Sequence, residues 1–179
     1  MALVRENNIK PEHIEEVIIG VDPGAKHYHQ PITARNQKRN IVDLQFSIPY
    51  TVANAIINRK LSFEHFDAEA LKRHDVLDFQ KKISFWVDPE VCFDNINKKC
   101  TAARIQIRTK DGKLYVKRVD YPKGHYLNPM TIQESIDKFW ECATLLSRSI
   151  PKEKLEKVLD LTLNLEKVDD VGSVIRLLT

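Results

Sequence analysis

The sequence predicts an α+β fold in two layers, with helices packed on one side of a mostly antiparallel sheet and a helical C-terminus. Three observations predict it: a hairpin signal in the middle of the chain, a capped amphipathic helix after residue 131, and strands and helices that are grouped instead of strictly alternating. The chain has 179 residues, of which 42% are hydrophobic, and is long enough to bury one core. We therefore expect a single α+β domain over residues 1–179.

The N-terminal part of the chain predicts a helix end, a strand and a loop. Residues 1–8 resemble the tail of a helix. A short strand follows, entered through a turn. Residues 22–40 contain two prolines, a glycine and no apolar period, which is typical of a loop. The apolar positions of the strand are Ile14, Val17, Ile19 and Val21.

A buried helix is predicted to begin at Ser47. This serine is a suitable N-cap, and Pro49 is tolerated in the first turn of a helix. The apolar residues that follow surround the helix axis almost completely, and such a helix is usually buried. Residues 61–83 predict one or two short helices with polar faces, beginning after Ser62, and residues 83–88 predict a strand.

The hairpin is predicted from Asp111-Gly112, which two strand-like segments flank. In the first of them apolar and polar residues alternate, so that basic side chains point away from the core. The expected inward residues are Ala103, Ile105 and Ile107, and the outward ones are Arg104, Gln106 and Arg108.

Helices are predicted for the remainder of the chain. Residues 120–131 form a turn-rich connector, and Thr131 with Glu134 gives the spacing of a capping box. Apolar residues then recur at helical spacing up to Leu146. A further helix starts at Pro151, and a last one is capped near Asp170.

The net charge of +3 is small, but basic residues are concentrated between residues 95 and 125. This stretch contains nine lysines and arginines and only two acidic residues, Asp111 and Asp120. Such a stretch could bind an anionic partner, either nucleic acid or a carboxylate substrate. The commoner alternative is that these residues form a solvated outer face of the sheet. Nucleic-acid binding is disfavoured, because among the basic residues of the hairpin only Tyr115 supplies a base-stacking aromatic ring.

The sequence offers weak metal sites and no common nucleotide-binding or hydrolase motif. His27 and His29 lie two positions apart in a loop, but a zinc site needs three or four ligands and no second pair is defined nearby. The spacing of Cys92 and Cys100 is not that of a CxxC pair. We expect no metal. Three sparse cysteines, with neither a signal peptide nor a membrane-spanning stretch in the sequence, lead us to expect a cytoplasmic protein.

Tyr50 is the most promising catalytic candidate, because it falls in the first turn of a helix. Free backbone N–H groups and the helix dipole favour an anion there, and a phenol can donate to a carboxylate or relay a proton. The alternative is a packed tyrosine whose hydroxyl is satisfied within the protein. Local reasoning alone favours this alternative.

Three stretches of the chain carry a resemblance to a known family. They are LVRENNIKPEHIEEVIIGV (3–21), FSIPYTVANAIINRKLSFEHF (46–66) and KDGKLYVKRVDYPKGHYLNPMTIQESIDKFWECA (110–143). In this order they resemble the C-terminal part of the MmgE/PrpD family, which includes 2-methylcitrate dehydratase, cis-aconitate decarboxylase and iminodisuccinate epimerase.

The resemblance implies a lyase or isomerase for small di- or tricarboxylates. It implies a homodimeric enzyme that needs no metal or organic cofactor, with an active site between a large helical domain and a smaller α+β domain. Tyr50 falls on the active-site tyrosine of the family and Ser47 on the serine of the same motif. Lys123, in a basic loop beside a glycine, is a weaker candidate for attracting substrate. Phe46 replaces a histidine of some relatives, which puts a decarboxylase-type specificity in doubt.

The chain matches only the smaller domain, so we expect a partner. In the family, a lysine and a histidine precede the first helix seen here, and the helical domain supplies further acidic and histidine residues. We expect this chain to form one wall of the active site and to be inactive alone. The alternative is a non-catalytic domain that associates with itself or with another subunit through apolar surface.

Overall fold

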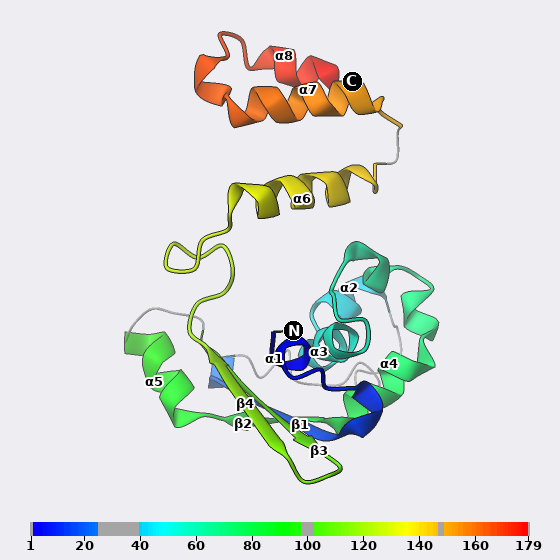
Figure 1. The fold of residues 1–179 in the computed structure, drawn as a ribbon, viewed down its shortest axis with the longest axis vertical. Helices are drawn as coiled ribbons and strands as arrows, with labels where there is room; N and C mark the ends of the chain where they lie inside the picture. The colour runs from blue at the N-terminus through cyan, green and yellow to red at the C-terminus, as the bar shows by residue number, and fades with distance from the viewer. Residues whose placement is uncertain (1, 25–39, 98–101, 147–148, 179) are drawn as a thin grey trace. The chain divides into compact units, whose positions relative to one another are not determined.

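The fold is described from a computed structural model, which covers residues 2–24, 40–97, 102–146 and 149–178. Within these ranges the chain forms four strands and eight α-helices, joined by short 3₁₀ turns, and the predicted α+β class is confirmed (Figure 1). The strands are β1 (Ile14–Val21), β2 (Ile83–Val87), β3 (Ala103–Thr109) and β4 (Leu114–Val119). The helices are α1 (Ala2–Glu6), α2 (Ile41–Gln45), α3 (Ile48–Ile57), α4 (His74–Phe79), α5 (Pro89–Asn97), α6 (Ile132–Ala143), α7 (Lys152–Leu163) and α8 (Gly172–Leu177).

The chain divides into two compact units, which we call the first unit (Met1–Pro122) and the second unit (Lys123–Thr179). The first unit holds the sheet with α1 to α5, and the second holds α6 to α8. The single domain expected over residues 1–179 stays a prediction. Unfolding of both units in one cooperative transition would support it.

The sheet of the first unit has the strand order β2-β1-β3-β4. The predicted hairpin is confirmed, since β3 and β4 are antiparallel neighbours and Gly112 adopts the left-handed φ of +83° in the turn. β1 pairs antiparallel with β3 but parallel with β2, so the sheet is mixed. The long connection from β1 to β2 carries α2, α3 and α4, which lie with α1 on one side of the sheet (Figure 1).

The core of the first unit lies between this helical layer and the sheet. The four apolar positions predicted for the strand β1 are all buried in it, and α3 contributes buried residues from its first turn to its last. Tyr115 and Ile105 pack at the edge of this core. The fully buried members with the largest side chains include Ile14, Leu44, Tyr50, Ile56 and Ile107.

Two helices were not predicted, α2 and α5. α2 is five residues long, too short for a periodic pattern, and is held by a capping box between Asn40 and Asp43. α5 begins at Pro89 after Asp88, whose carboxylate accepts hydrogen bonds from the N–H groups of Glu90 and Val91. An aspartate followed by a proline is a helix-start signal, so the sequence did contain an indication of α5.

In the second unit α7 packs against α8, and Leu155, Val158 and Val174 are buried. α6 begins at the predicted capping box: the Thr131 hydroxyl accepts from the Glu134 N–H at 3.1 Å, and the Glu134 carboxylate accepts from the Thr131 N–H at 2.8 Å. No residue of α6 is fully buried, but Ile136, Phe139 and Trp140 are partly buried and the helix contacts α7, so its cap and side-chain pairs add to a small packing contact.

Candidate functional site

The start of α3 is built as the sequence predicted. The Ser47 hydroxyl accepts the N–H of Tyr50 at 3.4 Å, and Pro49 occupies the first turn. Ser47 is only 1% exposed, so its cap is shielded from water. Phe46, directly before it, ends α2 and is half exposed. The short spacing between α2 and α3 therefore places the predicted serine and tyrosine side by side in one buried turn.

Tyr50 is fully buried, with an exposed fraction of 0%. Its hydroxyl donates to the His65 carbonyl at 2.8 Å, and its ring lies 6.1 Å from that of Phe66 between centroids. Burial raises the pKa of the Tyr50 phenol, so the group is a neutral hydrogen-bond donor. In this structure the hydroxyl is satisfied within the protein, which is the alternative that local reasoning favoured. Its catalytic role stays a prediction.

His65 holds the segment that covers the Tyr50 hydroxyl. Its Nδ1 accepts the N–H of Ser62 at 3.0 Å, which places the ring proton on Nε2. Burial lowers the pKa of the imidazole, so the neutral form is favoured. The sequence indicated a helix start after Ser62 but not this histidine. His65 lies three residues after the capping Ser62, the position that glutamate or glutamine usually takes in a capping box. That spacing could have indicated its role in the sequence.

Lys123 belongs to the second unit, and the structure describes it separately from Ser47 and Tyr50. Its ammonium group pairs with the Glu134 carboxylate at 2.8 Å, beside the cap of α6. This pair lowers the pKa of Glu134. Lys123 thus supports the start of a helix in this structure, and its role in attracting substrate stays a prediction.

Most of the concentrated basic residues are neutralised by carboxylates. Of the nine between residues 95 and 125, Lys98 and Lys99 lie outside the described residues, and six of the other seven form ion pairs. Because most of these charges are paired, the basic stretch fits the interpretation as a solvated face of the sheet better than that of a surface for an anionic partner. The pairs are Arg104 with Asp88 and Glu90, Arg108 with Glu16, Lys113 with Asp111, Lys117 with Glu6, Arg118 with Asp94 and Asp120, and Lys123 with Glu134.

Among the described residues, no group of three or more histidine, cysteine or acidic side chains is placed to hold a metal ion. His27, His29 and Cys100 lie outside those residues, while Cys92 and Cys142 are described as free thiols. None of the helices described is long and apolar enough to cross a membrane.

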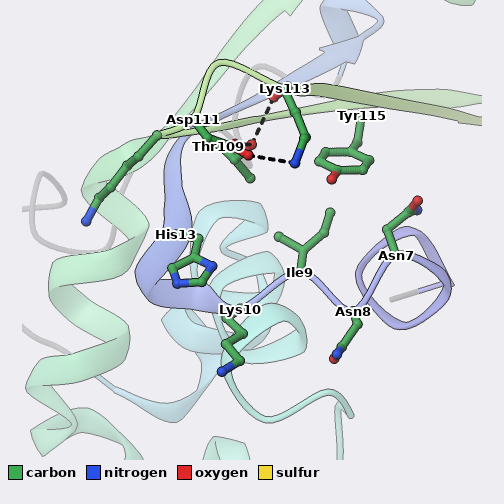
Figure 2. A pocket seen from close by; sticks show the side chains of 10 residues that line it. Asn7, Asn8, Ile9, Lys10, His13, Thr109, Asp111, Lys113 and Tyr115 are labelled. Carbon is green, nitrogen blue, oxygen red and sulfur yellow. Dashed lines mark hydrogen bonds and ion pairs between the residues drawn. The ribbon is translucent and has the colours of Figure 1, made fainter.

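A cavity of about 340 Å³ lies in the first unit, between the α1–β1 connector and the β3–β4 turn. Backbone pairing joins these two segments, because the Lys110 N–H donates to the His13 carbonyl at 2.8 Å. In Figure 2, Lys113 and Tyr115 project toward the space above Ile9. We call this space the hairpin cavity. It is lined by Asn7, Asn8, Ile9, Lys10, His13, Thr109, Lys110, Asp111, Lys113 and Tyr115.

Comparison with known proteins decides the family. A family model described as the MmgE/PrpD C-terminal domain matches residues 1–166. The chain belongs to the MmgE/PrpD family. The resemblance drawn from the three sequence stretches is therefore confirmed.

A curated relative of this MmgE/PrpD domain is the cis-aconitate decarboxylase of Mus musculus. The two are 22% identical over 186 residues, which cover 99% of this chain but 35% of the relative. The chain therefore spans about a third of the length of the curated relative that it matches.

Proposed function

We propose that this chain forms the smaller domain of an MmgE/PrpD-type lyase or isomerase that acts on small di- or tricarboxylates. The observation that carries the proposal is the family match over residues 1–166. Its chemistry would begin with removal of a proton next to a carboxylate, followed by loss of water, loss of carbon dioxide or re-protonation. The whole enzyme would be a cytoplasmic homo-oligomer.

In this proposal the start of α3 forms one wall of a carboxylate-binding cleft, and a helical domain forms the other. Ser47 and Tyr50 lie together there, and the helix N-terminus favours an anion. The Tyr50 hydroxyl donates to the His65 carbonyl at 2.8 Å, so it reaches substrate only if the segment around His65 shifts when the cleft is assembled. Lys123, half exposed beside Glu134, would attract substrate by its charge.

Reconstitution with a helical domain tests the proposal. The full chain would be mixed with a matching N-terminal helical domain of the MmgE/PrpD family and supplied with cis-aconitate or 2-methylcitrate. Carbon dioxide release and the absorbance of the carbon–carbon double bond report turnover. We expect turnover in the mixture and none with either part alone. Absence of turnover with every dicarboxylate and tricarboxylate offered, despite a stable complex, would contradict it.

The variant Tyr50→Phe separates catalysis from packing. It removes the hydroxyl but keeps the ring, so we expect turnover to fall at least tenfold in the reconstituted enzyme. Loss of the bond to the His65 carbonyl also costs about 1 kcal/mol of unfolding free energy. Unchanged turnover together with that loss of stability would assign Tyr50 to packing alone.

A second candidate function is a non-catalytic association domain. It is favoured by large apolar side chains exposed in the second unit, including Tyr126, Leu127, Ile132 and Ile175. Light scattering across a range of concentrations tests it. A monomer at all concentrations, alone and with the helical domain, would argue against association.

A further inference from the structure

The hairpin cavity carries an excess of positive charge. Lys10, Lys110 and Lys113 line it together with Asp111, which gives a formal charge of +2 with His13 neutral. Among the described residues, neither Lys10 nor Lys110 forms an ion pair, and both are exposed. This contrasts with the other described basic residues of the hairpin, which carboxylates neutralise.

The Asp111 carboxylate at the cavity is bound by two neighbouring side chains. Asp111 accepts from the Lys113 ammonium at 2.8 Å and from the Thr109 hydroxyl at 2.6 Å, and these bonds lower its pKa to about 2. Asp111 therefore stays ionised and holds the Lys113 side chain beside Tyr115 (Figure 2). A fixed ammonium group next to a phenol presents two hydrogen-bond donors to the same space.

The connector on the opposite side is fixed by Arg59. Its guanidinium group donates to the carbonyls of Val4 and Ile9 at 3.3 and 3.0 Å and to the Asn8 side-chain oxygen at 3.3 Å. Asn8 adopts a left-handed φ of +46°, which asparagine tolerates better than most residues. Arg59 therefore fixes the connector, while the Asn8 amide points away from Lys113 and Tyr115 in Figure 2.

We propose that the hairpin cavity is a binding site for a small polyanion that carries two or more carboxylate or phosphate groups. A space of about 340 Å³ is the size of a small-metabolite site. Lys10 and Lys110 attract the ligand by their charge, and the Lys113 ammonium and Tyr115 hydroxyl bind one of its anionic groups. The inference does not depend on the proposed function, because none of these residues belongs to the predicted cleft.

Calorimetric titration of the full chain tests this site. The probes are citrate and pyrophosphate at low ionic strength, with glycerol as an uncharged probe. We expect saturable binding of at least one anion, weakening as salt is added, and none of glycerol. Tighter binding of citrate would identify a carboxylate ligand, and tighter binding of pyrophosphate a phosphate ligand.

A charge-matched pair of variants locates the site. Lys10→Gln/Lys110→Gln removes two positive charges at the cavity, and Lys154→Gln/Lys157→Gln removes two from exposed positions on α7. We expect the first to lower affinity at least tenfold and the second to change it less than twofold. Exposed lysine substitutions leave folding intact, which thermal unfolding verifies.

Three outcomes would overturn the inference. They are no saturable binding at low salt, equal losses in the two double variants, and ligand-induced NMR shifts that leave the His13 and Lys110 amides unmoved. A single-stranded oligonucleotide that displaces citrate and binds more tightly than either small anion would instead assign the surface to nucleic acid.

Discussion

The two units of this chain keep their structure by different means. In the first unit a central strand is covered on one face by a layer of helices, and Ile14, Val17 and Ile107 are fully buried. In the second unit α6 buries no residue, and α7 and α8 bury only three between them. Apolar burial therefore stabilises the first unit, whereas helix caps and local side-chain pairs contribute a larger share in the second.

The largest contrast is expected from truncating one isoleucine in each unit. Ile107→Ala opens a cavity against β1 and should cost about 3 kcal/mol of unfolding free energy. Ile132→Ala, at a position that is 70% exposed, should change it by less than about 0.5 kcal/mol. Denaturant unfolding followed by circular dichroism measures both. Similar losses for the two variants would show that the two units depend equally on apolar burial.

A smaller effect is expected from the cap of α6. Thr131→Ala removes the acceptor for the Glu134 N–H and should destabilise this helix by about 1 kcal/mol. Amide hydrogen exchange should then speed up in α6 but not in the sheet. Thr131→Ser keeps the hydroxyl and serves as the control. Faster exchange in both units would show that they open together.

The smallest effect at neutral pH is expected at His65. Burial lowers its pKa in the folded state, so between that value and the ordinary histidine pKa of about 6.5 the unfolded chain binds more protons. Stability is therefore complete above about pH 6.5 and falls as the pH drops below it. His65→Asn keeps an acceptor for the Ser62 N–H without titrating, and should flatten this slope in denaturant melts between about pH 5 and 7. An equal slope in the variant would assign the pH dependence to other groups.

Local signals in the sequence predicted local structure well. Asp111-Gly112 predicted the hairpin, Thr131 and Glu134 predicted the capping box, and Ser47 predicted the start of α3, because each signal acts through residues a few positions apart. The parallel pairing of β1 with β2 was not predicted. Val17 pairs with Ile83, 66 positions later in the chain, so no local pattern indicates this pairing.

The candidate sites were less predictable because their partners come from distant parts of the chain. Lys117 pairs with Glu6, and the Tyr50 hydroxyl bonds a carbonyl fifteen positions away, so neither partner is visible in a local pattern. The charge count between residues 95 and 125 therefore overstated the free positive charge. The hairpin cavity was missed for the same reason, since the Asn7–His13 and Thr109–Tyr115 segments are brought together only by the sheet.

The strand order also has a consequence for synthesis of the protein. β1 forms the middle of the sheet, yet Val17 pairs with Ile83 on one side and Ile107 on the other, both much later in the chain. At about 5 to 20 residues per second, the ribosome exposes β1 for about 5 to 20 seconds before its second neighbour is made. An apolar strand without partners is a template for aggregation. The segment that organises the finished sheet is thus the one that depends most on protection while the chain is still growing.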